Sequence, residues 1–320
     1  MIRPIAGPTR ASGPSLLASV RAVLTALALM LSCLAPAVAA ESSTGQPLDG
    51  PGPHDVATLE VEVTRTRGGS GSFAARAYVP LMGADESGSA STPVVAFGHG
   101  YLADVDWYES TLVHLASWGI AVIAPRSGGG LIPDHGAFAD DLRSALDWAV
   151  AASADADTWP GGPVDTGALA VSGHSMGGGA AVLAAARQPD IGDVATLAAA
   201  ETRPSAIEAA ARIDASALFL AGSDDAITPI GDHQRPMFEA MEAGRARLGT
   251  LVGGSHCGFL DTVPAVLGLV CDEGALDPDR QRRITRGILT AWLMESAGDR
   301  NLGDIGSVIG PEGAPLILWE

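Results

Sequence analysis

The 320-residue sequence contains no lysine, and arginine supplies all 19 of its strongly basic side chains against 37 acidic ones. The formal charge of −18 at pH 7 comes from acidic residues that are scattered along the chain and do not gather into runs. A surface of this sign repels nucleic acid and anionic membranes. We therefore expect neither as a partner of this protein.

Long apolar runs are also missing, apart from one stretch near the N-terminus. Three arginines precede the apolar residues 22–34, which are followed by the small residues APAVAA. The stretch is shorter than the roughly 20 apolar residues of a membrane span, and this order is typical of a secretory signal peptide. We expect a signal peptide at residues 1–40, cleaved after Ala39 or Ala40. Its removal takes three arginines and no acid, which changes the formal charge from −18 to −21.

Cysteine is scarce, with three in the chain. Cys33 lies in the predicted signal, where lipid attachment is an alternative, although the preceding residues fit the lipoprotein pattern poorly. Cys257 and Cys271 would remain after cleavage. A secreted or periplasmic chain meets an oxidising compartment, in which two cysteines so close in sequence can pair. We expect a disulfide between them; the alternative is two buried free thiols.

The composition predicts a leader, one domain and a tail after the signal. Residues 41–55 are rich in Gly, Pro and Ser and lack periodicity, as expected of a flexible leader. Residues 56–297 suffice for one large domain with a continuous core. Residues 298–320 would then be a C-terminal tail. We expect a monomer.

Two apolar patterns predict the fold of this domain. Residues 58–66 and 72–80 alternate apolar and polar side chains around a glycine-rich turn, which indicates an antiparallel hairpin. Continuous apolar runs then alternate with helix-like segments, which indicates a parallel sheet with helices on both faces. The runs lie at 94–97, 120–125, 168–173, 194–200, 217–222 and 247–254, and the helices at 107–117, 137–152, 176–187, 205–212, 237–245 and 279–297. We expect an α/β fold with a mostly parallel, eight-stranded sheet and no cap domain.

One serine lies where such a fold can place a nucleophile. Ser175 is the centre of GHSMG, a Gly-x-Ser-x-Gly pattern between a predicted strand and a predicted helix. Gly173 and Gly177 allow the sharp turn between the two elements. The helix N-terminus offers free N–H groups to a developing oxyanion. We predict that Ser175 is a nucleophile; the alternative is a glycine-rich turn without chemistry.

A serine nucleophile needs a base within hydrogen-bond distance, and the chain has seven histidines. His256 follows the last predicted strand in the loop GGSHCGF, which should bring it over the carboxyl edge of the sheet, near Ser175. We predict that His256 is the base. For the other six, including His99 and His174, we expect structural roles.

The carboxylate that orients this base should follow the preceding strand, where Asp224 and Asp225 both lie. The spacing Gly222-x-x-Asp225-x-x-x-Pro229 places Gly and Pro on either side of the turn, which favours Asp225. Asp224 would then be a solvated turn residue. The chain order of serine, acid and histidine is the one known for nucleophile elbows on such sheets.

A second oxyanion donor should come from the loop after the first parallel strand. That loop reads GHGYLAD, and Gly98 and Gly100 permit close approach of its backbone. We predict that the N–H groups of Tyr101 and Met176 form the oxyanion hole and that the Tyr101 ring contacts substrate. The alternative for Tyr101 is a half-buried loop aromatic.

Together, GHSMGGG, GHGY, GSDDAITP and GGSH resemble the motifs of the dienelactone-hydrolase and chlorophyllase-like branch of α/β-hydrolases, which includes bacterial cutinases and poly(ethylene terephthalate) hydrolases. The resemblance covers about residues 56–297. It implies an α/β-hydrolase fold and an ester hydrolase that uses neither metal nor cofactor. It matches Ser175, Asp225 and His256 to the triad and Tyr101 and Met176 to the oxyanion donors.

Two departures from that family bear on the substrate. Its aromatic-polyester hydrolases carry a tryptophan between the nucleophile helix and the acid strand, where this chain has AAAETRPSA at 198–206. The disulfide near their histidine is not reproduced in the same positions. We therefore expect a carboxylesterase acting on a small-molecule or polymeric ester.

Two other classes of function would keep the same residues. An acyltransferase would pass the acyl group to an alcohol, but the lack of a cap favours water as the acceptor. A non-catalytic binding protein on the same scaffold would not need all three triad residues in order, so their presence counts against this class.

Overall fold

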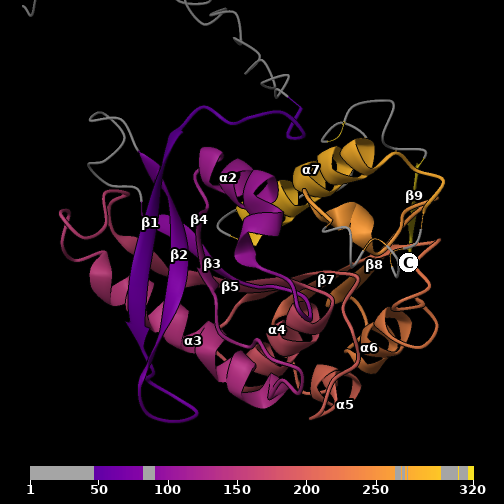
Figure 1. Cartoon of the computed structure of the whole chain (residues 1–320), viewed down its shortest axis with the longest axis horizontal. Coiled ribbons are helices and arrows are strands. Elements are labelled where there is room, and N and C mark those ends of the chain that lie inside the picture. Colours follow the sequence, from indigo (N-terminus) through magenta and orange to yellow (C-terminus); the bar gives the residue numbers. More distant parts are fainter. Residues whose placement is uncertain are drawn as a thin grey trace, which may run out of the picture. The chain divides into compact units, whose positions relative to one another are not determined.

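A nine-stranded sheet forms the centre of the structure (Figure 1). The computed structural model describes residues 47–81, 91–263, 268, 271, 273–296, 309 and 316–320. The strand order is β1-β2-β4-β3-β5-β6-β7-β8-β9. Strands β3 to β8 are parallel to one another, whereas β1, β2 and β9 pair antiparallel with their neighbours. The predicted α/β architecture, with a mostly parallel sheet and an N-terminal hairpin, is confirmed.

The strands and helices follow the predicted order. The strands are β1 (Asp55–Thr64), β2 (Ser72–Leu81), β3 (Thr92–Gly98), β4 (Ala121–Pro125), β5 (Val164–His174), β6 (Asp193–Leu197), β7 (Ser216–Gly222), β8 (Ala246–Leu251) and β9 (Ile317–Trp319). The helices are α2 (Glu109–Ser117), α3 (His135–Ala152), α4 (Met176–Arg187), α5 (Ala206–Ala210), α6 (Gln234–Ala240) and α7 (Pro278–Ser296), with 3₁₀ turns η1 (Val105–Tyr108) and η2 (Cys257–Phe259). In the described chain only β6 and the short α5 lie between α4 and β7.

The central strands are apolar throughout because helices cover both of their faces. Figure 1 shows α3, α4, α5 and α6 on one side of the sheet and α2 and α7 on the other. In β3, Val94 and Ala96 join the core cluster beneath the first group. Val95 and Phe97 join the cluster beneath the second. A strand buried on both faces shows a continuous apolar run, which explains the pattern in the sequence.

Local capping determines where several helices begin and end. The Asp134 side chain accepts a hydrogen bond from Ala137 N at 2.9 Å, so α3 begins two residues before its predicted start. Helix α6 begins three residues before its predicted start and ends at Ala240, where the prediction continued to residue 245. Pro236 lies in the first turn of α6, where no intrahelical donor is needed. Met241 is extended and ends the helix.

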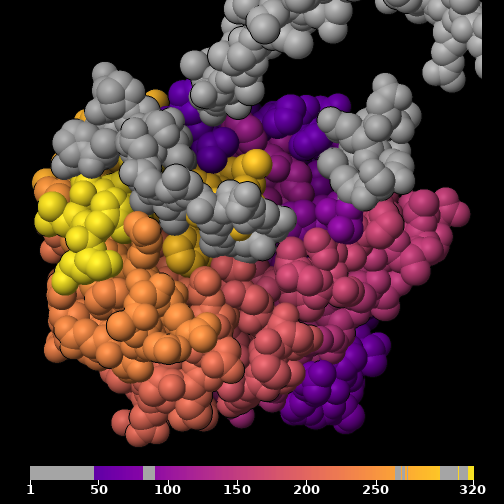
Figure 2. Space-filling view, turned by 180° about the vertical axis from the view of Figure 1, so that it is seen from behind, coloured from indigo at the N-terminus to yellow at the C-terminus, as the bar shows by residue number. Residues whose placement is uncertain are grey.

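The C-terminus adds a ninth strand to the eight expected. Strand β9 pairs antiparallel with β8, and Trp319 lies opposite Gly249. A Cβ at Gly249 would lie 2.8 Å from the Trp319 ring, so any larger residue there would displace that ring. In Figure 2 these yellow residues lie at the surface beside orange ones. The prediction missed β9 because three residues are too few to show a period.

Part of the expected leader is hydrogen-bonded to the end of α2. Gly52 N donates to Ser117 Oγ at 2.9 Å, His54 N donates to Ser117 O at 3.0 Å, and Trp118 Nε1 donates to Gly50 O at 2.9 Å. The predicted signal peptide, residues 1–40, lies outside the described residues. Among the helices that are described, none has the length and apolar character needed to cross a membrane.

Deleting residues 316–320 should lower the melting temperature by several degrees, because β8 would become an unpaired edge and Gly249 would lose Trp319. Thermal unfolding followed by circular dichroism, with light scattering for aggregation, measures both effects.

The control is Glu320→Gln, which keeps β9 and removes only a partly exposed ion pair with Arg235. Such a pair contributes at most about 1 kcal/mol, so the control should melt close to wild type. If the truncated chain melts with the full chain, β9 does not stabilise the fold.

Candidate active site

Ser175 occupies a strained turn between β5 and α4. Its φ of 55° and ψ of −121° lie in a region that residues with a side chain rarely adopt. The neighbouring β6 end holds this turn in place: Ser175 N donates to Leu197 O at 2.9 Å, and Ser175 O accepts from Ala200 N at 2.8 Å. The backbone conformation therefore matches the predicted nucleophile elbow.

The glycines of the motif are required by close backbone approach. A Cβ on Gly177 would lie 2.1 Å from Gly98 O, and one on Gly173 would lie 2.5 Å from the carbonyl carbon of Gly177. Both distances are far below any real contact. Helix α4 thus starts directly against the end of β3.

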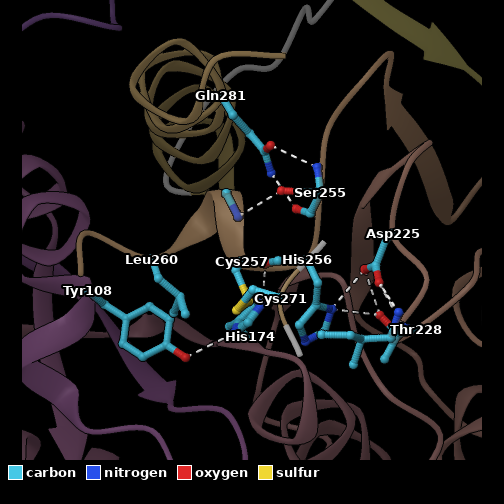
Figure 3. Close-up of a disulfide and its surroundings, with 12 residues drawn as sticks. Tyr108, His174, Asp225, Thr228, Ser255, His256, Cys257, Leu260, Cys271 and Gln281 are labelled. Carbon is cyan, nitrogen blue, oxygen red and sulfur yellow. Dashed lines mark hydrogen bonds and ion pairs between the residues drawn. A yellow bond between two sulfur atoms is a disulfide. The ribbon is translucent and has the colours of Figure 1, made fainter. Parts of the chain in front are cut away.

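Asp225 follows β7 and receives hydrogen bonds on both of its carboxylate oxygens. Oδ1 accepts from Ile227 N at 2.9 Å and Thr228 N at 2.7 Å. Oδ2 accepts from Thr228 Oγ1 at 2.8 Å and lies 2.8 Å from His256 Nδ1 (Figure 3). Because an ionised carboxylate can only accept, the shared proton lies on Nδ1. His256 Nε2 is then left with a free lone pair.

The surroundings of Asp225 favour its ionised form. Burial acts to raise the pKa of this carboxyl, but the hydrogen bond and charge of His256 and the bonds from Thr228 outweigh burial. The pKa of Asp225 is therefore below its ordinary value. At neutral pH the carboxylate is charged and can hold the His256 ring.

Asp224, the other predicted candidate, makes different contacts. It is exposed, and its oxygens accept from Ser223 Oγ at 2.9 Å and Ala275 N at 3.0 Å. The geometry thus pairs His256 with Asp225 and gives Asp224 a loop-fastening role.

The main chain before and after His256 is also fixed, in addition to the imidazole ring. Gln281 of α7 accepts from Ser255 N at 3.0 Å and donates to Ser255 O at 2.8 Å. The predicted disulfide joins Cys257, the next residue after His256, to Cys271 (Figure 3). The loop that carries the predicted base is therefore fastened to α7 and to a second loop.

Ser175 and His256 line one cavity of about 310 Å³. Its other lining residues are Gly100, Tyr101, Leu102, Ala103, Trp107, Tyr108, His174, Ile227, Cys257, Leu260 and Cys271. Tyr101 thus lies at the cavity, and its hydroxyl donates to Leu131 O at 3.0 Å. Met176 is the first residue of α4, where a helix has unpaired N–H groups. Both positions suit donors to a substrate oxygen.

Sequence reasoning missed three aromatic groups at this cavity. Trp107 and Tyr108 are the first two residues of a predicted helix, and His174 was expected to have only a structural role. The His174 and His256 rings have centroids 4.6 Å apart. Burial, and then the charge of His256, lower the pKa of His174 well below its ordinary value. His174 occupies the variable position before the serine in Gly-x-Ser-x-Gly, which was the available signal for it. The residue type alone, however, does not reveal its hydrogen-bond partners.

The arrangement suits acyl transfer. A hydroxyl, an imidazole held by a carboxylate and a partly enclosed cavity are the groups that such chemistry needs. Among the residues that the structure describes, no group of three or more His, Cys, Asp or Glu side chains could hold a metal ion.

Comparison with known proteins identifies the family. No curated protein matches the chain. A family model described as PET hydrolase-like matches residues 27–266, three quarters of the chain. The match includes the elbow serine, the buried aspartate and the histidine that it binds. The chain therefore belongs to the PET hydrolase-like family, a family of ester hydrolases within the α/β-hydrolase superfamily.

Proposed function

We propose that this chain is an exported serine hydrolase that cleaves carboxylic esters through an acyl-enzyme. The observation that carries the proposal is the 2.8 Å contact between Asp225 Oδ2 and His256 Nδ1, at a cavity that the elbow residue Ser175 also lines. The predicted signal peptide supports export, to the periplasm or the medium.

The proposed reaction has two halves. Ser175 Oγ attacks the ester carbonyl while His256 Nε2 takes its proton, and the resulting oxyanion accepts hydrogen bonds from Tyr101 N and Met176 N. His256 then gives the proton to the departing alcohol. Water repeats the sequence on the acyl-enzyme and releases the acid. Asp225 holds the imidazole in the correct tautomer throughout.

The cavity wall favours uncharged esters. No Asp, Glu, Lys or Arg occurs among the described residues that line it, and its side walls are built from Leu102, Ala103, Trp107 and Leu260. Transfer of apolar groups to such a wall is favourable, whereas a charged group would lose its hydration. An apolar acyl or alcohol group is therefore the expected occupant.

A polymeric ester is a second candidate substrate because the cavity mouth is apolar. Tyr101, Leu102 and Ile227 line the cavity and yet remain 45%, 44% and 40% exposed. Trp107 supplies an aromatic wall, although segment 198–206 lacks tryptophan. A panel of p-nitrophenyl esters of rising chain length, together with a polyester film, separates the candidates. Turnover of the short esters alone would restrict the proposal to small substrates.

Ser175→Ala should fold normally and lose esterase activity by about 10⁶-fold, and His256→Ala should be comparably severe, because both residues act in the same step. Hydrolysis of p-nitrophenyl butyrate measures the loss, and circular dichroism confirms the fold. Retention of more than a few per cent of wild-type kcat in Ser175→Ala would refute the nucleophile.

Asp225→Asn should reduce kcat by about 10³- to 10⁴-fold, because an amide favours the wrong tautomer of His256. Asp224→Asn is the matched control: it makes the same change one residue earlier, on a carboxylate bonded to Ser223 and Ala275. We expect its kcat to stay within about twofold of wild type, as for other surface substitutions. The reverse ranking would transfer the role to Asp224.

Cys271→Ser should lower the melting temperature and kcat together. The bridge spans 14 residues in sequence, and closing a loop of that size stabilises by about 3 kcal/mol. Cys257 adjoins His256 and both cysteines line the cavity, so loss of the bridge also frees the loop of the base.

Cys257→Ser/Cys271→Ser, which has no free thiol, controls for the thiol left in the single variant. Titration of the denatured, unreduced mature protein should find no reactive thiol. If the melting temperature alone falls, the bridge does not position the base.

A further inference from the structure

Three loops of the site are connected by one buried chain of hydrogen bonds, of which Figure 3 shows the link between Tyr108 and His174. Gly100 N donates to Tyr108 Oη at 3.0 Å, and Tyr108 Oη lies 2.9 Å from His174 Nδ1. His174 Nε2 lies 3.1 Å from the main-chain carbonyl oxygen of His256. Gly100 precedes Tyr101, His174 precedes Ser175, and His256 is the proposed base. The chain therefore runs from the proposed oxyanion loop through the elbow to the base.

Hydrogen-bond chemistry gives this chain one direction. An amide N–H can only donate, so Tyr108 accepts from Gly100. A carbonyl oxygen can only accept, so His174 carries its proton on Nε2 and offers the Nδ1 lone pair to the Tyr108 hydroxyl. Each donor is used once and no group is left over. Burial raises the pKa of Tyr108 and lowers that of His174, which keeps both groups neutral.

Solvent cannot substitute for the members of this chain. Tyr108 is 0% exposed and His174 is 2% exposed. The rings also pack in sequence, since the Tyr108 and His174 centroids are 5.6 Å apart and those of His174 and His256 are 4.6 Å apart. A buried polar group that loses its partner is costly, so the protein strongly prefers the arrangement in which all links are made.

We propose that Tyr108 and His174 are positioning residues, which hold the oxyanion loop and the main chain of His256 in register with the nucleophile; this rests on the proposed function of Ser175 and His256. Asp225 holds the ring of His256, and Gln281 holds the preceding residue. Neither contact links His256 to the elbow. The hydrogen bond from His174 does, because His174 is bonded covalently to Ser175. Catalytic groups must be held to within about 0.5 Å, which this direct link provides.

Tyr108→Phe tests the proposal by removing one oxygen atom and two links. We expect kcat to fall by about ten- to a hundredfold on a soluble p-nitrophenyl ester, with KM within about twofold, because misplacement of reacting groups affects the chemical step more than binding. Ser175→Ala, measured alongside, reports separately on the proposed function.

Tyr78→Phe is the matched control. Tyr78 is also 0% exposed, and its hydroxyl donates to Glu109 at 2.5 Å, away from the cavity. The same atom is lost, so the melting temperature should fall in both variants, but kcat should fall only in Tyr108→Phe. Equal effects on kcat in the two variants, or none in Tyr108→Phe, would overturn the positioning role.

Variants at His174 keep the test decisive if Tyr108→Phe folds poorly. His174→Gln retains one acceptor and one donor on a flexible side chain, whereas His174→Phe retains a ring and neither function. We expect His174→Gln to keep more of the wild-type kcat than His174→Phe by about tenfold, at similar melting temperatures. The opposite order would show that only ring packing matters.

The tautomer of His174 can be measured without any turnover. Two-bond ¹H–¹⁵N correlation spectra of the wild-type protein should show Nε2 protonated and Nδ1 as an acceptor at neutral pH. Protonation on Nδ1 would reverse the chain and overturn the inference. Because this measurement is independent of activity, it can fail while the proposed hydrolysis stands, and the reverse is also true.

Discussion

The contact between the backbones of Gly98 and Gly177 is the constraint on which the site depends. A Cβ on Gly177 would lie 2.1 Å from Gly98 O, so α4 begins in direct contact with the end of β3. This leaves Ser175 in its strained conformation, tied to Leu197 and Ala200 at the end of β6. The loop after Gly98 is thereby also placed beside the serine. The proposed nucleophile and the proposed oxyanion loop thus derive their proximity from a single backbone contact.

The parts of the site that could be predicted are those marked by local sequence. The elbow shows as glycines around a serine between an apolar strand and a helix, and the aspartate and histidine follow strand ends. Between the adjacent Asp224 and Asp225, the spacing of Gly222 and Pro229 around the turn favoured Asp225. The structure pairs Asp225 with His256 and fastens Asp224 to Ala275.

The parts that could not be predicted depend on residues far apart in the chain. Tyr108 contacts His174 across 66 positions, and His174 contacts His256 across 82. No periodicity links such residues, and a buried histidine in a glycine-rich motif has the same appearance with or without partners. Strand β9 was missed for a related reason, since its three residues can be recognised as a strand only from their pairing with β8.

The acidic composition contributes to the site indirectly. The described residues that line the cavity include no Asp, Glu, Lys or Arg. The loop that follows Gly100, however, carries Asp104 and Asp106, which pair with Arg126 at 2.5 and 2.8 Å. Arg76 of β2 also reaches Asp106, at 2.6 Å. Isolated surface pairs stabilise little, whereas carboxylates shared between two arginines form a network with several fixed contacts. The loop is therefore held by ion pairs on its outer side and by Tyr108 on its inner side. Between these two anchors, Tyr101, Leu102, Ala103 and Trp107 of the same segment line the cavity.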